Sequence, residues 1–168
     1  MKPRTILKNR KQKISIFICC EGKTELAFLK YVKNLYISGD QKSIRINSIN
    51  GGNICKMKKY IKTKKKHIHI DKYYILSDGD QIGSQNINDE KVLIASPCIE
   101  KLFLEILDQS KLKTTKECKK IFETKYLNRK DKLSSQSYQK IFNKDKLEDA
   151  RRKIPLLNRV LKIFEAEK

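Results

Sequence analysis

The feature that most constrains the fold is a continuous apolar segment, Ile14–Cys20 (ISIFICC), with charged residues on both sides. A strand with one face in water alternates apolar and polar residues, whereas an uninterrupted apolar run is typical of a strand buried on both faces. Strands of that kind occur mainly in parallel sheets covered by helices. The segment therefore predicts a central strand in a covered sheet.

The rest of the first hundred residues alternates between extended and helical patterns. Further strands are expected at residues 43–49, 73–77 and 91–95. Helices are expected at residues 24–37, with Thr24 as N-cap, at 53–65, and at 97–107, with Pro97 in the first turn. The order β-α-β-α-β-β-α predicts an α/β fold with a largely parallel sheet of about four strands, flanked by helices.

The length of 168 residues predicts one domain. Within it we expect a basic flexible arm at residues 1–13, a core at 14–110 and a helical C-terminal extension packed on the core at 111–168. Helical patterns in the extension cover residues 112–126 and 146–166, and Pro155 is expected to start or kink the second helix.

Two features indicate a cytoplasmic protein without a membrane partner. The longest apolar run is far shorter than the ~20 residues that span a bilayer, and no signal-peptide pattern follows the basic N-terminus. The five cysteines are odd in number and form no CxxC pair, which favours reduced thiols over a disulfide framework or a zinc finger.

The formal net charge is +20, from 39 basic and 19 acidic residues. Such a charge fits a phosphate-rich partner, a nucleic acid or a nucleotide, although an AT-rich genome also enriches lysine without selection for binding. Clustering of the basic residues along the chain favours binding over the genomic explanation. We expect a nucleic-acid track on one lysine-rich helix, with a solvated helix face as the alternative, at Lys56, Lys58, Lys59, Lys62, Lys64, Lys65 and Lys66.

Acidic residues follow three of the four predicted strands. Glu21 follows the first strand, Asp78 and Asp80 follow the third, and Glu100 comes after the fourth. The carboxyl ends of parallel strands meet at one edge of a sheet, so these side chains should converge. Clustered carboxylates repel one another unless a cation neutralises them, and oxygen ligands suit Mg²⁺ or Mn²⁺. The alternative is that these acids are ordinary turn and cap residues.

These motifs resemble the TOPRIM signature, in which a buried strand ends in Glu-Gly and a later strand ends in D-x-D-x-x-G. Here they are Glu21-Gly22 and Asp78-x-Asp80-x-x-Gly83. The chain is most similar to the RloB-like family of TOPRIM proteins, through the segments CEGKTE at residues 20–25 and SPCIEKLF at residues 96–103. It departs from that family in lacking an Asn before Pro97 and in having Leu102 at the position of a Trp.

The resemblance implies a TOPRIM-like core and Mg²⁺-dependent (or Mn²⁺-dependent) cleavage of phosphodiester bonds in RNA, tRNA included, or in DNA. Glu21 would be a general acid/base or a metal ligand, Asp78 and Asp80 would bind metal, and Glu100 would complete the carboxylate cluster. Lys23 and Glu25 are further candidates for the site, against simple surface and helix-dipole roles. RloB-like proteins are associated with bacterial anti-phage defence, often beside a partner ATPase.

Two hypotheses of different classes follow. The first is a metal-dependent TOPRIM nuclease that is the effector of a defence system. The second is a non-catalytic TOPRIM scaffold that binds nucleic acid or a partner ATPase. A complete set of clustered carboxylates favours the first, because a scaffold has no electrostatic reason to keep it. The missing Trp and the short chain favour the second.

Overall fold

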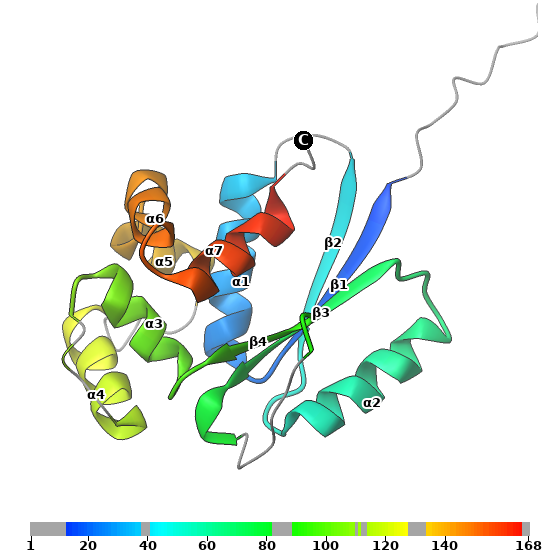
Figure 1. Ribbon diagram of the computed structural model, residues 1–168, viewed down its shortest axis with the longest axis horizontal. Helices are drawn as coiled ribbons and strands as arrows, with labels where there is room; N and C mark the ends of the chain where they lie inside the picture. The colour runs from blue at the N-terminus through cyan, green and yellow to red at the C-terminus, as the bar shows by residue number, and fades with distance from the viewer. Residues whose placement is uncertain are drawn as a thin grey trace, which may run out of the picture.

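The sheet of this protein is wholly parallel. A computed structural model describes residues 13–37, 41–81, 89–109, 111, 114–127 and 134–165. Its strands are β1 (Ile14–Cys20), β2 (Lys42–Ser48), β3 (Lys72–Asp78) and β4 (Val92–Ala95). They form one sheet in the order β2-β1-β3-β4, with every neighbouring pair parallel (Figure 1). The predicted α/β class and four-stranded parallel sheet are confirmed.

Strand β1 lies inside the sheet and is buried on both faces, as its apolar run predicts. Ile16, Ile18 and Cys20 belong to one hydrophobic cluster, and Phe17 and Cys19 to a second cluster on the other face. This division follows from the two-residue period of a strand, which sends successive side chains to opposite faces. The sheet is therefore the central layer, with helices on both sides.

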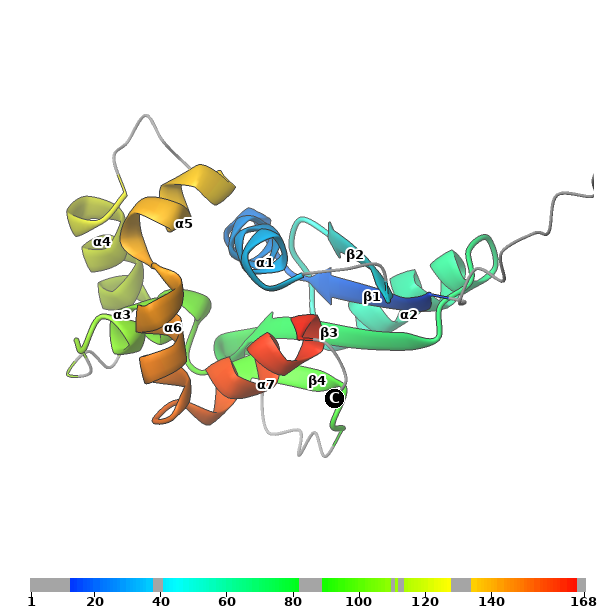
Figure 2. The same cartoon turned by 90° about the horizontal axis from the view of Figure 1, so that it is seen from above.

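The two faces carry different numbers of helices. Helix α2 (Ile54–Lys65) covers the smaller cluster and buries Ile54, Met57 and Ile61 at helical spacing. Helices α1 (Lys23–Tyr36) and α7 (Pro155–Phe164) cover the other face (Figure 2). Pro155 is the first residue of α7, so it starts this helix rather than kinking it.

Four more helices gather beside α1 (Figure 1). They are α3 (Ile99–Ile106), α4 (Thr115–Lys125), α5 (Ser135–Ile141) and α6 (Lys144–Arg151). Their contacts are largely aromatic, with ring centroids 4.8 Å apart for Phe28 and Phe103 and 4.9 Å for Phe103 and Phe122. Tyr138 of α5 and Phe142, which caps the end of that helix, complete this aromatic group. One hydrophobic cluster thus includes the sheet and helices from both the predicted core and the predicted extension.

Several local predictions were wrong. The N-cap of α1 is Gly22 rather than Thr24, because the Glu25 carboxylate accepts from the Gly22 N–H at 3.1 Å and closes the first turn. Pro97 follows a cis bond and precedes α3, whose N-cap is Cys98. Helix α5 was missed altogether. All but the last residue of the expected arm at 1–13, and also Gly83, lie outside the described residues.

Among the described residues, no helix combines the length and apolar character needed to cross a membrane. The five cysteines are free thiols, and all but Cys55 are buried.

Candidate functional site

Sheet register brings the predicted acids to one edge. Cys20 of β1 is paired with Leu76 of β3, so Glu21, which follows Cys20, lies beside the end of β3. Asp78 is paired with Ala95, the last residue of β4, after which the chain turns into α3. The convergence expected at the carboxyl edge of the sheet is therefore present in the structure.

Asp78 is the most constrained of these acids. It is 6 % exposed, and its Oδ1 accepts the Ile99 N–H, the first of α3, at 2.9 Å. Burial, together with the charges of Glu25 and Glu100, raises the pKa of Asp78 to about 7, although the Ile99 N–H and Lys119 oppose the rise. This carboxyl group both caps a helix and carries an energetic cost when it ionises.

The turn between the two aspartates is tightly packed. Gly79 begins a short 3-10 turn, Gly79–Gln81, and a Cβ at Gly79 would lie only 2.9 Å from Ser96 Cα. The Asp80 N–H donates to Pro97 O at 3.1 Å, which ties this turn to the segment before α3. Asp80 itself is exposed, with its Oδ2 3.3 Å from the Thr115 hydroxyl. The glycine lets the two backbone segments approach closely enough to place both aspartates at the edge.

Glu21 lies between the aspartates and the glutamates. Burial raises its pKa above the usual value, and the Asp80 charge adds to the rise, while the Asp78 N–H, Lys119 and the Ser77 hydroxyl oppose it. Its Oε2 is buried and has no hydrogen-bond partner among the described atoms. A buried anionic oxygen without a donor is costly, so this atom is suited to receive a proton or a cation.

Glu25 and Glu100 form the buried side of the cluster. They are 4 % and 6 % exposed, in the first turns of α1 and α3. Burial raises the pKa of Glu25, and the charges of Glu100 and Glu21 raise it further. The Oε2 of Glu100 is also buried without a hydrogen-bond partner in the described structure. Lys23, by contrast, lies exposed at the first position of α1.

Two residues at this edge were missed by sequence reasoning. Lys119 Nζ lies 3.9 Å from Asp78 Oδ2, and the charges of Glu100, Asp78 and Asp80 raise its pKa although burial opposes the rise. Thr115, one helical turn earlier in α4, contacts Asp80. Their spacing of four places both on one face of a helix. Nothing in the sequence distinguishes that face among the many lysine-bearing helices, so only the fold could reveal it.

The acids fit a hard cation by chemistry but not by their present arrangement. Carboxylate oxygens are the ligands that Mg²⁺ and Mn²⁺ prefer, and the unpartnered oxygens of Glu21 and Glu100 could satisfy part of such a shell. As they lie, however, no group of three His, Cys, Asp or Glu side chains among the described residues could hold a metal ion. The ammonium group of Lys119 lies beside the cluster, 3.9 Å from Asp78 Oδ2.

The predicted lysine track lies on α2, and several of its members have contacts within the protein. Lys56 donates to Gly51 O at 3.0 Å, and Lys58 pairs with Asp89 at 3.0 Å. Lys64 and Lys65 lie over the rings of Tyr60 and Tyr73. All members except the half-buried Lys64 are exposed. The track is thus a basic helix face on which two of the lysines, Lys64 and Lys65, already contact aromatic rings.

Comparison with known proteins adds no family assignment. No protein-family model matches the chain, and comparisons with curated proteins and with solved structures likewise give no match.

Proposed function

We propose that this protein is a divalent-cation-dependent nuclease that hydrolyses phosphodiester bonds. The observation that carries the proposal is the gathering of Glu21, Asp78, Asp80 and Glu100 at the carboxyl edge of a parallel sheet, with two of their oxygens buried and unpartnered. Maintaining such a cluster costs stability. A cation bound between the acids and a phosphate group would offset that cost.

Asp78, Asp80 and Glu100 are the residues proposed to hold Mg²⁺ or Mn²⁺. When bound, such an ion lowers the pKa of a water molecule and stabilises the charge that develops on a phosphoryl group. Glu21 is proposed to take the proton from the attacking water, and its buried Oε2 without a hydrogen-bond donor supports this role. Hydrolysis then forms the new P–O bond with the water oxygen and breaks the bond to the leaving nucleotide oxygen.

Lys119 is proposed to change partners during this reaction. In the described arrangement its ammonium group partly neutralises Asp78 and lies in the field of Glu100 and Asp80. Lys119 would be repelled from the cluster if a cation were bound there, and a substrate phosphate would attract it. The side chain is 45 % exposed and therefore has room to turn toward the substrate. Asp78 would then be available as a ligand for the ion.

A second candidate is a non-catalytic TOPRIM-like scaffold that binds nucleic acid or a partner ATPase. The observation that favours it is the same lysine, because a protein cation beside Asp78 stabilises the cluster without any metal. The present spacing of the acids is also compatible with this alternative. The nuclease cleaves nucleic acid and needs a divalent cation to do so, whereas the scaffold binds its partner without cleaving it.

The test is cleavage of tRNA, single-stranded RNA and plasmid DNA in Mg²⁺, Mn²⁺ or EDTA. We compare the wild type with Asp78→Asn/Asp80→Asn and with a control, Asp145→Asn/Asp149→Asn, which neutralises two exposed acids of α6. The nuclease proposal expects cleavage that is lost in EDTA and falls at least about 10³-fold in the first variant only. Cleavage that persists in both EDTA and that variant contradicts the proposal.

The resemblance to RloB-like proteins supports the further proposal that the nuclease serves anti-phage defence with a partner ATPase. If the purified chain cuts nothing, the same assay is repeated with the product of a neighbouring gene, an ATPase where one is present. Metal-dependent cleavage that appears only with this partner supports a regulated effector. Partner binding without any cleavage supports the scaffold.

A further inference from the structure

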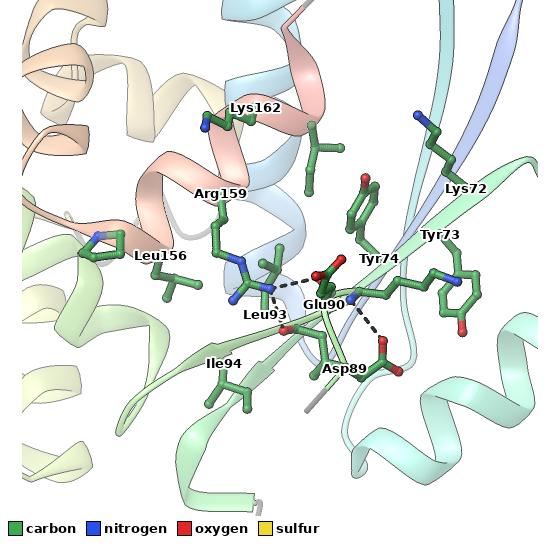
Figure 3. Close-up of a pocket in the computed structure, with 14 residues that line it drawn as sticks. Lys72, Tyr73, Tyr74, Asp89, Glu90, Leu93, Ile94, Leu156, Arg159 and Lys162 are labelled. Carbon is green, nitrogen blue, oxygen red and sulfur yellow. Dashed lines mark hydrogen bonds between the residues drawn. The ribbon is translucent and has the colours of Figure 1, made fainter. Parts of the chain in front are cut away.

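A second, positively charged site lies at the opposite end of the sheet from the carboxylates. There, a groove of about 1030 Å³ runs between the beginning of β3, the segment leading into β4, and α7 (Figure 3). Four cations from three parts of the chain line it: Lys72, Lys91, Arg159 and Lys162. The carboxylate cluster contributes no residue to this groove, so the two sites are separate.

The acids of the groove do not cancel its charge. Asp89 and Glu90 also line it, but Asp89 Oδ2 lies 3.0 Å from Lys58 Nζ, which lowers the pKa of Asp89 through that hydrogen bond and adds another cation nearby. A smaller neighbouring hollow of about 180 Å³, on the α2 side of Tyr73, adds Lys62 and Lys65. The surroundings of the groove therefore favour a polyanion.

Two tyrosines give the groove aromatic surface. Tyr73 and Tyr74 are both half-buried. As neighbours in β3 they belong to opposite faces of the sheet, in the part of β3 that precedes its pairing with β4. The ammonium groups of Lys65 and Lys91 each lie 4.9 Å from the centroid of the Tyr73 ring. Aromatic rings beside lysines are the combination with which proteins hold single-stranded nucleic acid, through base stacking and phosphate contacts.

The edge of β4 is poorly suited to the other common occupant, an added β-strand. The Lys91 carbonyl faces β3, where it accepts from the Ile75 N–H at 2.8 Å. The carbonyls of Glu90 and Val92 face outward, and the Arg159 guanidinium donates to them at 2.9 and 3.3 Å (Figure 3). A partner strand would have to displace this arginine before it could pair with β4.

We propose that this groove binds a single strand of nucleic acid, with phosphates on Lys72, Lys91 and Lys162 and a base against Tyr74. The inference rests on the proposed function and deepens it, since it names a single strand as the form of the substrate. From Tyr73 to Asp78 the chain advances five strand residues, roughly 17 Å. A strand that contacts both sites must therefore span more than about five stacked nucleotides.

The test is binding of fluorescent oligonucleotides of about 12 nucleotides, RNA and DNA, followed by anisotropy in EDTA at fixed salt. The groove variant is Lys91→Glu/Lys162→Glu. Its control, Lys30→Glu/Lys146→Glu, makes the same charge change at exposed positions of α1 and α6 outside the groove. Tyr74→Leu, which keeps an apolar side chain, tests the aromatic contribution. Circular dichroism verifies that each variant is folded.

We expect the groove variant to raise the Kd for single strands at least about tenfold and the control less than about threefold. Tyr74→Leu should raise it about fivefold or more, because stacking on one ring is lost. ATP and GTP serve as competitors, since a mononucleotide presents the same base and phosphate chemistry. An unlabelled oligonucleotide that displaces the fluorescent one at far lower concentration than ATP or GTP does supports a site for a strand.

Equal loss in the groove variant and its control overturns the inference, since binding would then follow net charge alone. Displacement of the oligonucleotide by an acidic peptide at equal charge concentration, or tighter binding of a mononucleotide, also overturns it. Because binding is measured without metal, the outcome does not depend on cleavage. Groove-specific binding by a protein that cuts nothing supports the groove while contradicting the nuclease.

Discussion

Asp78 performs two functions that conflict energetically. Its carboxylate accepts the Ile99 N–H at 2.9 Å and so caps α3, yet it is almost completely buried among other acids. The first role favours the charged form and the second opposes it, and burial dominates because the pKa is raised to about 7. A residue with such a balance is typical of a functional site, where stability is given up for chemistry.

Neutralising this residue should therefore stabilise the metal-free protein. A carboxyl whose pKa is raised on folding destabilises the native state above its unfolded pKa, and the full cost, roughly 4 kcal/mol, is reached only above the folded pKa. Asp78→Asn keeps an oxygen for Ile99 and removes the charge. We expect its Tm in EDTA to exceed that of the wild type by several degrees at about pH 8, and the gain to shrink toward about pH 5.

Asp80→Asn is the control, because Asp80 is exposed and its neutralisation should change the Tm little. Thermal unfolding followed by circular dichroism measures both variants. A lower Tm for Asp78→Asn than for the wild type at about pH 8 would show that the helix-capping role of the charge outweighs the repulsion.

The acids of the candidate site could be predicted from the sequence, whereas Lys119, the cation beside them, could not. Glu21, Asp78 and Glu100 could be found because they follow strands whose carboxyl ends must meet. Lys119 lies on α4, far along the chain, and is one lysine among many in a very basic sequence. Its proximity to Asp78 depends on how α4 packs against α3, which is determined by tertiary contacts rather than by a local pattern.

Among the elements, the turn after β3 depends on its glycine. The ends of β3 and β4 approach so closely that a Cβ on Gly79 would lie 2.9 Å from Ser96 Cα, 3.1 Å from Ser96 Cβ and 3.2 Å from Ala95 O. Two of these atoms are backbone and cannot rotate away. The D-G-D sequence is thus a packing requirement at the point where two strands leave the sheet.

Gly79→Ala should consequently destabilise the protein by about 1–3 kcal/mol and displace both aspartates. The comparison is Gly22→Ala, where the added Cβ would meet only the end of the flexible Glu25 side chain, at 3.0 Å. We expect a smaller loss there. Chemical denaturation gives the free energies of unfolding, and equal losses in the two variants would contradict this account of the turn.

Element prediction succeeded where one pattern dominated and failed where a tertiary contact decided. Strand β1 was predicted to the residue because its apolar run is unbroken. Pro97 was assigned to a helix on its local preference, yet its carbonyl accepts from Asp80, so this residue belongs to the turn that holds the site. Helix α5 has few apolar residues of its own, and its Tyr138 is buried only because α1 and α3 surround it.

The molecule as a whole has one main hydrophobic cluster, which joins the sheet to the helices that follow it. Leu157, Val160 and Leu161 of α7 are fully buried in the same cluster as Ile18 of β1 and Leu76 of β3. The parallel topology was predictable from the order of elements. The packing of α7 over one face of the sheet was not predictable, since the amphipathic pattern of that helix does not specify which surface it covers.

This dependence predicts that a fragment ending at residue 127 does not fold cooperatively. Without α5, α6 and α7, one face of the sheet and the ring of Phe28 lose much of their cover. We expect the fragment to lose the sharp thermal transition of the complete chain and to bind a hydrophobic dye. A cooperative transition in the fragment would show that α1 alone protects the sheet.

The position of α7 also has a consequence during synthesis. A ribosome releases β1 and its Glu21 early, but the face of the sheet around Ile18 stays open until α7 has emerged. Lys119, the neutralising partner of Asp78, is likewise made some forty residues after that aspartate. The acidic edge is therefore assembled only when nearly all of these 168 residues have been translated. A nascent chain would thus carry Glu21 and Asp78 long before the proposed catalytic site could form.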